Sequence, residues 1–90
     1  MVRIIFPSII SRVNKESETE VSADTLHEAI SKLVDKYGEP FKKMIFEESG
    51  ELNRYLTFYV KGRYLTGADI METKIGIDDE VVIMVIIGGG

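Results

Sequence analysis

The sequence predicts an α+β domain in which one main helix packs across one face of a mixed sheet. Short stretches rich in β-branched and aromatic residues stand near both ends of the chain, and one long stripe of helical period lies between them. Ninety residues provide one modest core and leave no room for a second domain. We therefore expect a single domain over residues 1–87, followed by a flexible glycine tail over residues 88–90.

The first quarter of the chain is expected to form two short strands. Residues 2–6 are β-branched or aromatic apart from Arg3, and Pro7 closes the stretch because proline has no backbone N–H to donate to a sheet. A polar connection through residues 14–16 then leads to a second strand over residues 18–21.

The main helix is expected to begin near residue 25 and to end at residue 38. Thr25 and Glu28 have the spacing of a capping box, in which hydroxyl and carboxylate satisfy each other's orphan amides. Gly38 can take the left-handed conformation that ends a helix. Between these signals, one apolar stripe repeats with helical spacing: Leu26, Ala29, Ile30, Leu33, Val34 and Tyr37.

The second half of the chain is expected to complete the sheet. Pro40 opens a short helical turn that continues to residue 46, since proline suits a first helical position. A strand over residues 55–60 follows, and a tight turn at Lys61 and Gly62 leads into a short strand near Tyr64. Residues 67–77 are irregular with a small helical piece near residue 70, and residues 81–87 form an unbroken apolar run.

The last apolar run has the character of a central strand, which we expect to lie parallel to the first strand and beside it. That arrangement is the β-grasp, or ubiquitin-like, fold. One helix covers only one face of such a sheet, so the other face is expected to be an apolar partner surface. Its members should come from these residues: Phe6, Phe58, Tyr59, Met84 and Ile86.

Composition excludes several classes of function. A net charge of −4 argues against binding to nucleic acid or to an anionic membrane, both of which select basic surfaces. The chain has no cysteine, which excludes disulfides, thiolate zinc sites and a cysteine nucleophile. It has neither an apolar run long enough to span a membrane nor a cleavable leader, so we expect a cytoplasmic protein. With no cysteine and one histidine, we also expect no bound metal, and no motif predicts a bound cofactor.

Three polar features are expected to be ordinary solvated structure. His27 lies off the apolar stripe in the first turn of the helix. The acidic residues 78–80 read as a turn before the last strand, because a calcium site needs more oxygen ligands in a defined loop. Glu47, Glu48 and Glu51 also read as a turn, with docking of a basic partner as the alternative.

The three glycines that follow the last strand suggest a chemical role. Gly88, Gly89 and Gly90 have no Cβ atoms, so they can be threaded through a narrow channel, and a terminal carboxylate on such an arm is uncrowded. An enzyme that activates a carboxylate as an acyl-adenylate needs such a group. The chain has no phosphate loop and no nucleophile–base motif, so it is expected to be a substrate rather than an enzyme acting alone.

The chain resembles the MoaD/ThiS group of ubiquitin-like sulfur carriers, and is most similar to the small subunit of molybdopterin synthase. The resemblance spans nearly the whole chain and rests on the order and spacing of several fragments. These are the first strand ending in Phe6, the helix start at residues 24–26, residues 33–38, the turn at 48–52, the strand and turn at 55–62, residues 79–81, and the final glycines.

This resemblance implies a function for the tail. Gly90 would be adenylated with ATP by an enzyme related to ubiquitin-activating enzymes and then converted to a thiocarboxylate. The sulfur would pass to the pterin precursor in molybdopterin biosynthesis, with Gly88 and Gly89 threading into the large subunit of molybdopterin synthase. The family's apolar contacts to its enzymes fall on the first and last strands, here at these positions: Phe6, Met84 and Ile86.

Three alternatives stay open at this level. A ubiquitin-like modifier would begin with the same adenylation but transfer Gly90 to a lysine amine of a target protein. A thiamine-pathway carrier would deliver its sulfur elsewhere, although it is usually more compact than this chain. A β-grasp interaction module would have an inert tail. Without its partner, the protein could also form a weak homodimer through the open face.

Overall fold

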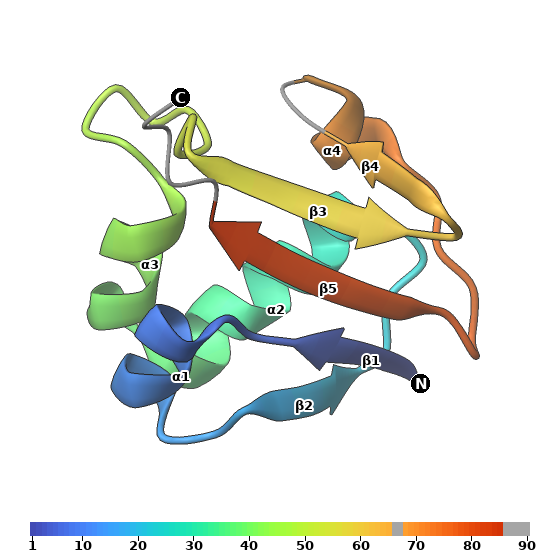
Figure 1. Cartoon of the computed structure of the whole chain (residues 1–90), viewed down its shortest axis with the longest axis horizontal. Helices are drawn as coiled ribbons and strands as arrows, with labels where there is room; N and C mark the ends of the chain where they lie inside the picture. Colours follow the sequence, from blue (N-terminus) through green and yellow to red (C-terminus); the bar gives the residue numbers. More distant parts are fainter. Residues whose placement is uncertain (66–67, 86–90) are drawn as a thin grey trace.

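The computed structural model describes residues 1–65 and 68–85 (Figure 1). The strands alternate with helices along the chain rather than gathering in one block. The elements, in chain order, are β1 (Val2–Ile5), α1 (Ser8–Asn14), β2 (Glu18–Val21), α2 (Leu26–Tyr37), α3 (Glu39–Ile45), β3 (Leu56–Val60), β4 (Arg63–Leu65), α4 (Ala68–Glu72) and β5 (Glu80–Val85).

The described strands form one five-stranded mixed sheet in the order β2-β1-β5-β3-β4. β5 lies in the centre, parallel to β1 and antiparallel to β3, with Ile4 opposite Val81 and Phe58 opposite Ile83. The first and last strands are therefore neighbours, and α2 crosses behind them (Figure 1). The expected β-grasp fold is confirmed.

α2 begins with a modified form of the expected capping box. The Thr25 hydroxyl accepts a hydrogen bond from the Glu28 N–H at 3.1 Å, as the spacing predicts. The Glu28 carboxylate, however, accepts from the N–H of Asp24 at 2.7 Å and so satisfies the residue before the cap. Asp24 is in turn held through its carbonyl, which accepts from the Ile75 N–H at 3.0 Å. At the other end, Gly38 ends the helix at the expected position with a positive φ of +80°, but its ψ of −162° differs from that of the expected left-handed conformation.

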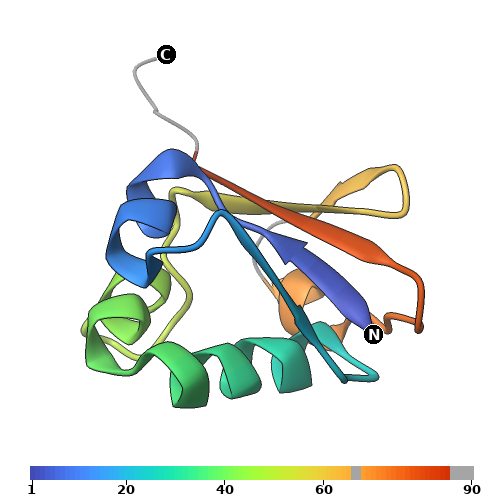
Figure 2. The ribbon, with the colours of Figure 1, turned by 90° about the horizontal axis from the view of Figure 1, so that it is seen from below.

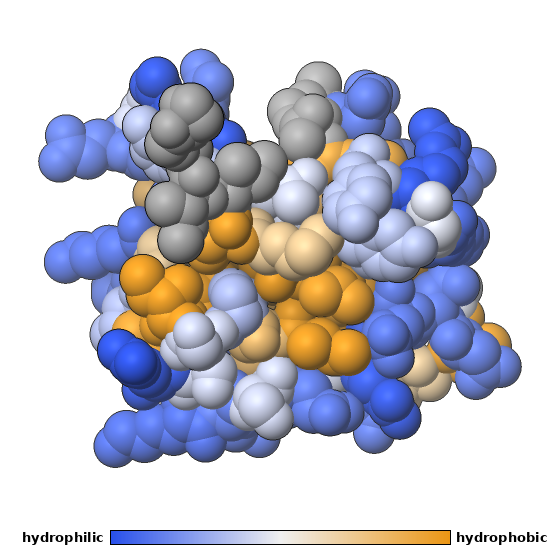
Figure 3. Space-filling model, viewed as in Figure 1, coloured by the Kyte–Doolittle hydropathy of each residue, from blue (hydrophilic) through white to orange (hydrophobic). Residues whose placement is uncertain are grey.

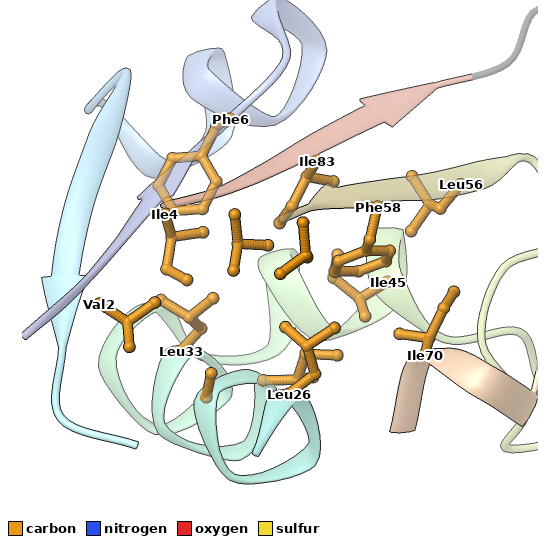
Figure 4. Close-up of a cluster of buried hydrophobic side chains, with 14 of the residues drawn as sticks. Val2, Ile4, Phe6, Leu26, Leu33, Ile45, Leu56, Phe58, Ile70 and Ile83 are labelled. Atoms are coloured by element: carbon orange, nitrogen blue, oxygen red, sulfur yellow. The ribbon is translucent and has the colours of Figure 1, made fainter. Parts of the chain in front are cut away.

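The core lies between the sheet and α2 (Figure 4). α3 and α4 contribute buried side chains to it from different sides of the molecule (Figure 1). Alternate residues of β1 and β5 point into it, as the pleat of a strand requires. The apolar stripe of α2 supplies the opposite wall. Fully buried members include Val2, Ile4, Ile10, Leu26, Ile30, Leu33, Phe41, Ile45, Phe58, Val60, Ile70 and Ile83.

Side chains of α2 also fasten the helix to β2 and to the loop before it. The Lys36 ammonium donates to the buried Thr19 hydroxyl at 2.6 Å and pairs with Glu16 at 3.4 Å. The Tyr37 hydroxyl donates to the same Glu16 carboxylate at 2.6 Å, and this hydrogen bond is the main reason that the pKa of Glu16 is lowered. We call Glu16, Thr19, Lys36 and Tyr37 the α2–β2 clamp.

Residues 8–14 form α1, a helix that was not expected, and the polar connection to β2 is correspondingly shorter than expected because Asn14 belongs to the helix. Only Ile10 and Asn14 of this helix are buried, which gives too short an apolar period to recognise in the sequence. Pro7 at its N-terminus has no side chain that can cap, so the usual start signal is also missing. α1 lies at the end of the sheet where β1 and β5 finish (Figures 1 and 2).

Candidate functional site

Within the described residues, no helix covers one of the two faces of the sheet. Figure 2 shows α2 below the sheet and the opposite face open. A row of side chains crosses this face from β1 to β4, since Ile5 pairs with Val82, Val82 with Tyr59, and Tyr59 with Tyr64. We call these four residues the open-face row. The rings of Tyr59 and Tyr64 lie 4.8 Å apart between centroids, and Tyr64 is 69% exposed.

Met84 extends the open-face row toward the end of β5. It stands two residues after Val82, so it lies on the same face, and it is half-buried. Its cross-strand partner is Thr57, whose hydroxyl donates to the Leu65 carbonyl at 3.0 Å. The expected position of Met84 on the open face is therefore confirmed, and Figure 3 shows the apolar surface that runs across this face.

Phe6 and Phe58 are not part of the open face, which corrects the expectation for both. Phe58 is 1% exposed and Phe6 is 6% exposed. Phe6 stands after β1, where its ring packs edge-on against Tyr37 at 5.6 Å and against Phe41 at 6.1 Å. Since α2 and α3 cover it, Phe6 stabilises the core and does not offer an exposed partner contact.

The tail residues Gly88, Gly89 and Gly90, and the expected contact residue Ile86, lie outside the described residues. The structure does describe where the strand before them ends. Val85, the last residue of β5, lies opposite Leu56 at the start of β3. Both ribbon views show α1 near this end of β5 (Figures 1 and 2). This end of the sheet is the base of the tail.

A groove of about 820 Å³ lies next to the base of the tail, between α3 and the start of β3. Lys42 and Lys43 line it from α3, and Tyr55, which is 54% exposed, lines it from the residue before β3. Glu47 also lines the groove. Its carboxylate accepts a hydrogen bond from the Arg54 backbone N–H at 3.0 Å and pairs with the Arg54 guanidinium at 3.4 Å. The backbone hydrogen bond is the main reason that the pKa of Glu47 is lowered.

The polar clusters noted in the sequence do not form a reactive centre. Among the described residues, no group of three or more His, Cys, Asp or Glu side chains is placed to hold a metal ion. His27 is exposed on α2. Asp79 is used to close the turn before β5, because its carboxylate accepts from the Gly76 N–H at 2.6 Å and pairs with Lys61 at 3.3 Å. Within residues 1–65 and 68–85, no helix combines the length and apolar character needed to cross a membrane.

The comparisons with known proteins agree with this fold over the full chain length. No protein-family model matches the chain. A candidate sulfur carrier protein of Archaeoglobus fulgidus is 28% identical over 89 residues, which is 99% of this chain and 98% of the relative.

Solved structures give the same result at the level of fold. Small archaeal modifier protein 1 from Methanosarcina acetivorans matches with a TM-score of 0.83 and 22% identity, over 99% of this chain and 95% of that one. A chain of the BexX/CysO complex from Amycolatopsis orientalis matches with a TM-score of 0.81 and 21% identity, over the whole of both chains. Subunit 1 of a candidate molybdopterin converting factor from Pyrococcus furiosus matches with a TM-score of 0.70 and 17% identity, over 93% of this chain and 94% of that one.

The chain has the ubiquitin-like β-grasp fold and resembles the MoaD/ThiS group of sulfur carriers. In this chain, sequence reasoning missed three of the four residues of the open-face row. The signal for Ile5 was present, because alternation from the buried Val2 and Ile4 places Ile5 on the opposite face. Val82 carried the same signal, because it stands two residues before Met84, which was expected on the open face. Tyr64 could not be found in this way, because its facing depends on strand register, which the sequence does not display.

Proposed function

We propose that this protein is a cytoplasmic sulfur carrier, in which the Gly90 carboxylate attacks the α-phosphate of ATP on an adenylating enzyme and releases pyrophosphate. A sulfide equivalent from a separate donor then attacks the carbonyl carbon, AMP leaves, and a thiocarboxylate remains. The observation that carries the proposal is that one central strand supplies both parts of the function. β5 contributes Val82 and Met84 to the open face and leads directly into the glycine-rich residues.

Docking on the open face suits this role because its part near the end of β5 is apolar and no element of the described chain covers it. The charged pair Arg3 and Glu80 lies at the other end of the face. Half-buried Ile5, Val82 and Met84 would lose their remaining water contact against a partner, and aromatic side chains such as Tyr59 and Tyr64 are favoured at interfaces. We assign Met84 to this contact and Ile86 to its continuation toward the tail. Gly88 and Gly89 would form the part of the tail that enters the enzyme.

The recipient of the sulfur is proposed to be the molybdopterin precursor, bound by the large subunit of molybdopterin synthase. Support comes from the likeness to a protein described as a subunit of a molybdopterin converting factor. The second candidate is a protein modifier, which is favoured by the likeness to an archaeal modifier protein. There the lysine amine of a target would displace AMP, and an amide to Gly90 would replace the thiocarboxylate. Delivery of sulfur to the thiamine pathway is a third outcome of the same activation.

The deciding experiment is the intact mass of the protein from its native host, with tandem mass mapping of residues 81–90. A species in which one oxygen at Gly90 is replaced by sulfur supports the carrier. A branched peptide that joins Gly90 to a lysine supports the modifier instead. An unmodified Gly90, recovered even after incubation with ATP and the host's adenylating enzyme, would contradict both, as would a native chain that continues past Gly90.

A further inference from the structure

α1 presents an apolar face to solvent, which is unusual for a helix at the surface of a small domain. Ile9 is 53% exposed and Val13 is 40% exposed. They stand four residues apart, so they lie one above the other on the same side of the helix. The buried residues of α1, Ile10 and Asn14, lie about 100° farther around the helix. The exposed pair therefore makes an apolar stripe that the core does not use.

The sequence of α1 is poorly suited to stabilising the helix by itself. No side chain caps its N-terminus, and it is only seven residues long. Asn14 is 8% exposed, and among the described residues neither its amide nitrogen nor its amide oxygen has a hydrogen-bond partner. A buried unsatisfied amide costs about 1–3 kcal/mol. Local features that weaken a fold often mark a functional surface.

The position of α1 places it close to any enzyme that binds the end of the chain. Gly90 is the fifth residue after Val85, and five extended residues span at most about 18 Å. An enzyme that holds the Gly90 carboxylate in its active site must therefore approach the base of the tail closely. α1 flanks this base, as both ribbon views show (Figures 1 and 2).

The charge on α1 differs from that of the chain as a whole. The protein carries a net charge of −4, yet α1 contains no acidic residue and exposes Arg12 between Ile9 and Val13. Arg12 makes no ion pair among the described residues. A partner surface that is apolar and carries a carboxylate would match both the stripe and the guanidinium.

We propose that Ile9, Arg12 and Val13 form a second docking surface, which binds the rim of the adenylating enzyme's active site while the open-face row binds its body. This inference rests on the proposed function. It assigns to α1 the task of holding the base of the tail against the enzyme. Ile9 and Val13 would enter an apolar patch on the rim, and Arg12 would pair with an acidic residue there.

The test is steady-state adenylation, followed as ATP–pyrophosphate exchange with the purified adenylating enzyme of the host. The double variant Ile9→Ser/Val13→Ser should raise KM at least about tenfold and leave kcat nearly unchanged, since burying two such side chains is worth more than one decade of affinity. Ile77→Ser is the matched control, because Ile77 is 73% exposed and precedes the opposite end of β5. Its KM should equal that of the wild type.

A second measurement needs no variant. Backbone amides of α1 in the wild-type protein should exchange with deuterium more slowly in the enzyme complex than in the free protein. An unchanged KM in the double variant, an equal rise in KM for Ile77→Ser, or unchanged exchange in α1 would overturn the inference. If one of these results is obtained but deletion of Gly89 and Gly90 abolishes ATP–pyrophosphate exchange, the proposed function stands and only the role of α1 fails. If the wild type is not adenylated, the proposed function fails as well.

Discussion

Two lysines hold a backbone conformation that normally selects glycine or asparagine. Lys15 has a φ of 62° at the end of α1, and Lys61 has a φ of 52° in the turn between β3 and β4. Lys61 is compensated by its contact with Asp79 at 3.3 Å and by donation to the Lys74 carbonyl at 3.4 Å. Lys15 makes no such side-chain contact among the described residues, so its left-handed conformation is an uncompensated cost.

Lys15→Gly should therefore stabilise the protein. Relief of left-handed strain, about 1–2 kcal/mol, exceeds the entropy that glycine loses on folding, about 0.5–1 kcal/mol, so a net gain of about 0.5–1 kcal/mol is expected. Urea unfolding measures it. Lys61→Gly is the control and should gain less, because it also loses the contact with Asp79. Equal gains in both variants would show that this contact contributes nothing.

Met84→Asp tests the open face at the scale of one side chain. A carboxylate in place of this half-buried thioether cannot be buried against an apolar partner without a large desolvation cost. We expect KM for adenylation to rise at least about tenfold, with kcat nearly unchanged, because docking and not chemistry is impaired. Thermal unfolding of the variant confirms that the sheet is intact. A folded variant with wild-type KM would remove Met84 from the interface.

Gly90→Ala tests the uncrowded carboxylate. A methyl group on the carbon next to the reacting carboxylate should misplace it in the enzyme, and misplacement by about 1 Å costs about 10²-fold in rate. The loss should appear in kcat of ATP–pyrophosphate exchange rather than in stability, since residue 90 follows the folded core. A wild-type rate would contradict the threading role of the glycines.

At the level of elements, α1 contains features that lower the stability of the fold, namely an uncapped N-terminus and the unpaired buried amide of Asn14. Asn14→Leu replaces the unpaired buried amide with an apolar group of similar size and should raise the free energy of unfolding by about 1–2 kcal/mol. Chemical denaturation measures the change. Asn53→Leu is the contrasting variant, because the Asn53 amide donates to the Met44 carbonyl at 3.2 Å, so its loss should destabilise. A destabilised Asn14→Leu would mean that the amide is satisfied in solution.

Which elements could be predicted depends on how local their signals are. α2 was found because its cap, stripe and final glycine all lie within fifteen residues. α1 was missed because a seven-residue helix without a cap has almost no local signal. The parallel pairing of β1 with β5 followed from the unbroken apolar run. The burial of Phe6 could have been predicted, because continued alternation from Val2 and Ile4 places it on the core side, where it is 6% exposed.

At the scale of the whole molecule, acid should weaken the hydrogen bonds of Glu16 and of Glu47 over the same pH range. The pKa values of Glu16 and Glu47 are both lowered from 4.5 in the folded protein, chiefly by hydrogen bonds to Tyr37 and to the Arg54 backbone respectively. Their contribution to stability is therefore complete above that value and is lost as the pH falls through the lower folded pKa values. Glu16 belongs to the α2–β2 clamp, and Glu47 holds the segment between α3 and β3.

The free energy of unfolding should accordingly decline as the pH falls below about 4.5. Urea unfolding at a series of pH values checks this. The double variant Glu16→Gln/Glu47→Gln should show a flatter profile of unfolding free energy against pH than the wild type. A double variant with an unaltered slope would assign the acid sensitivity to other carboxylates.

The central place of β5 has a consequence for how the molecule is made. β1 is synthesised first but lacks its parallel neighbour until residues 80–85 have been added, so the sheet cannot close around its middle before nearly the whole described chain exists. A ribosome that stops early releases a chain without its central strand, which cannot bury the core and is open to proteolysis. A compact domain can therefore form only after synthesis has passed β5, so we expect prematurely ended chains to be degraded rather than to accumulate.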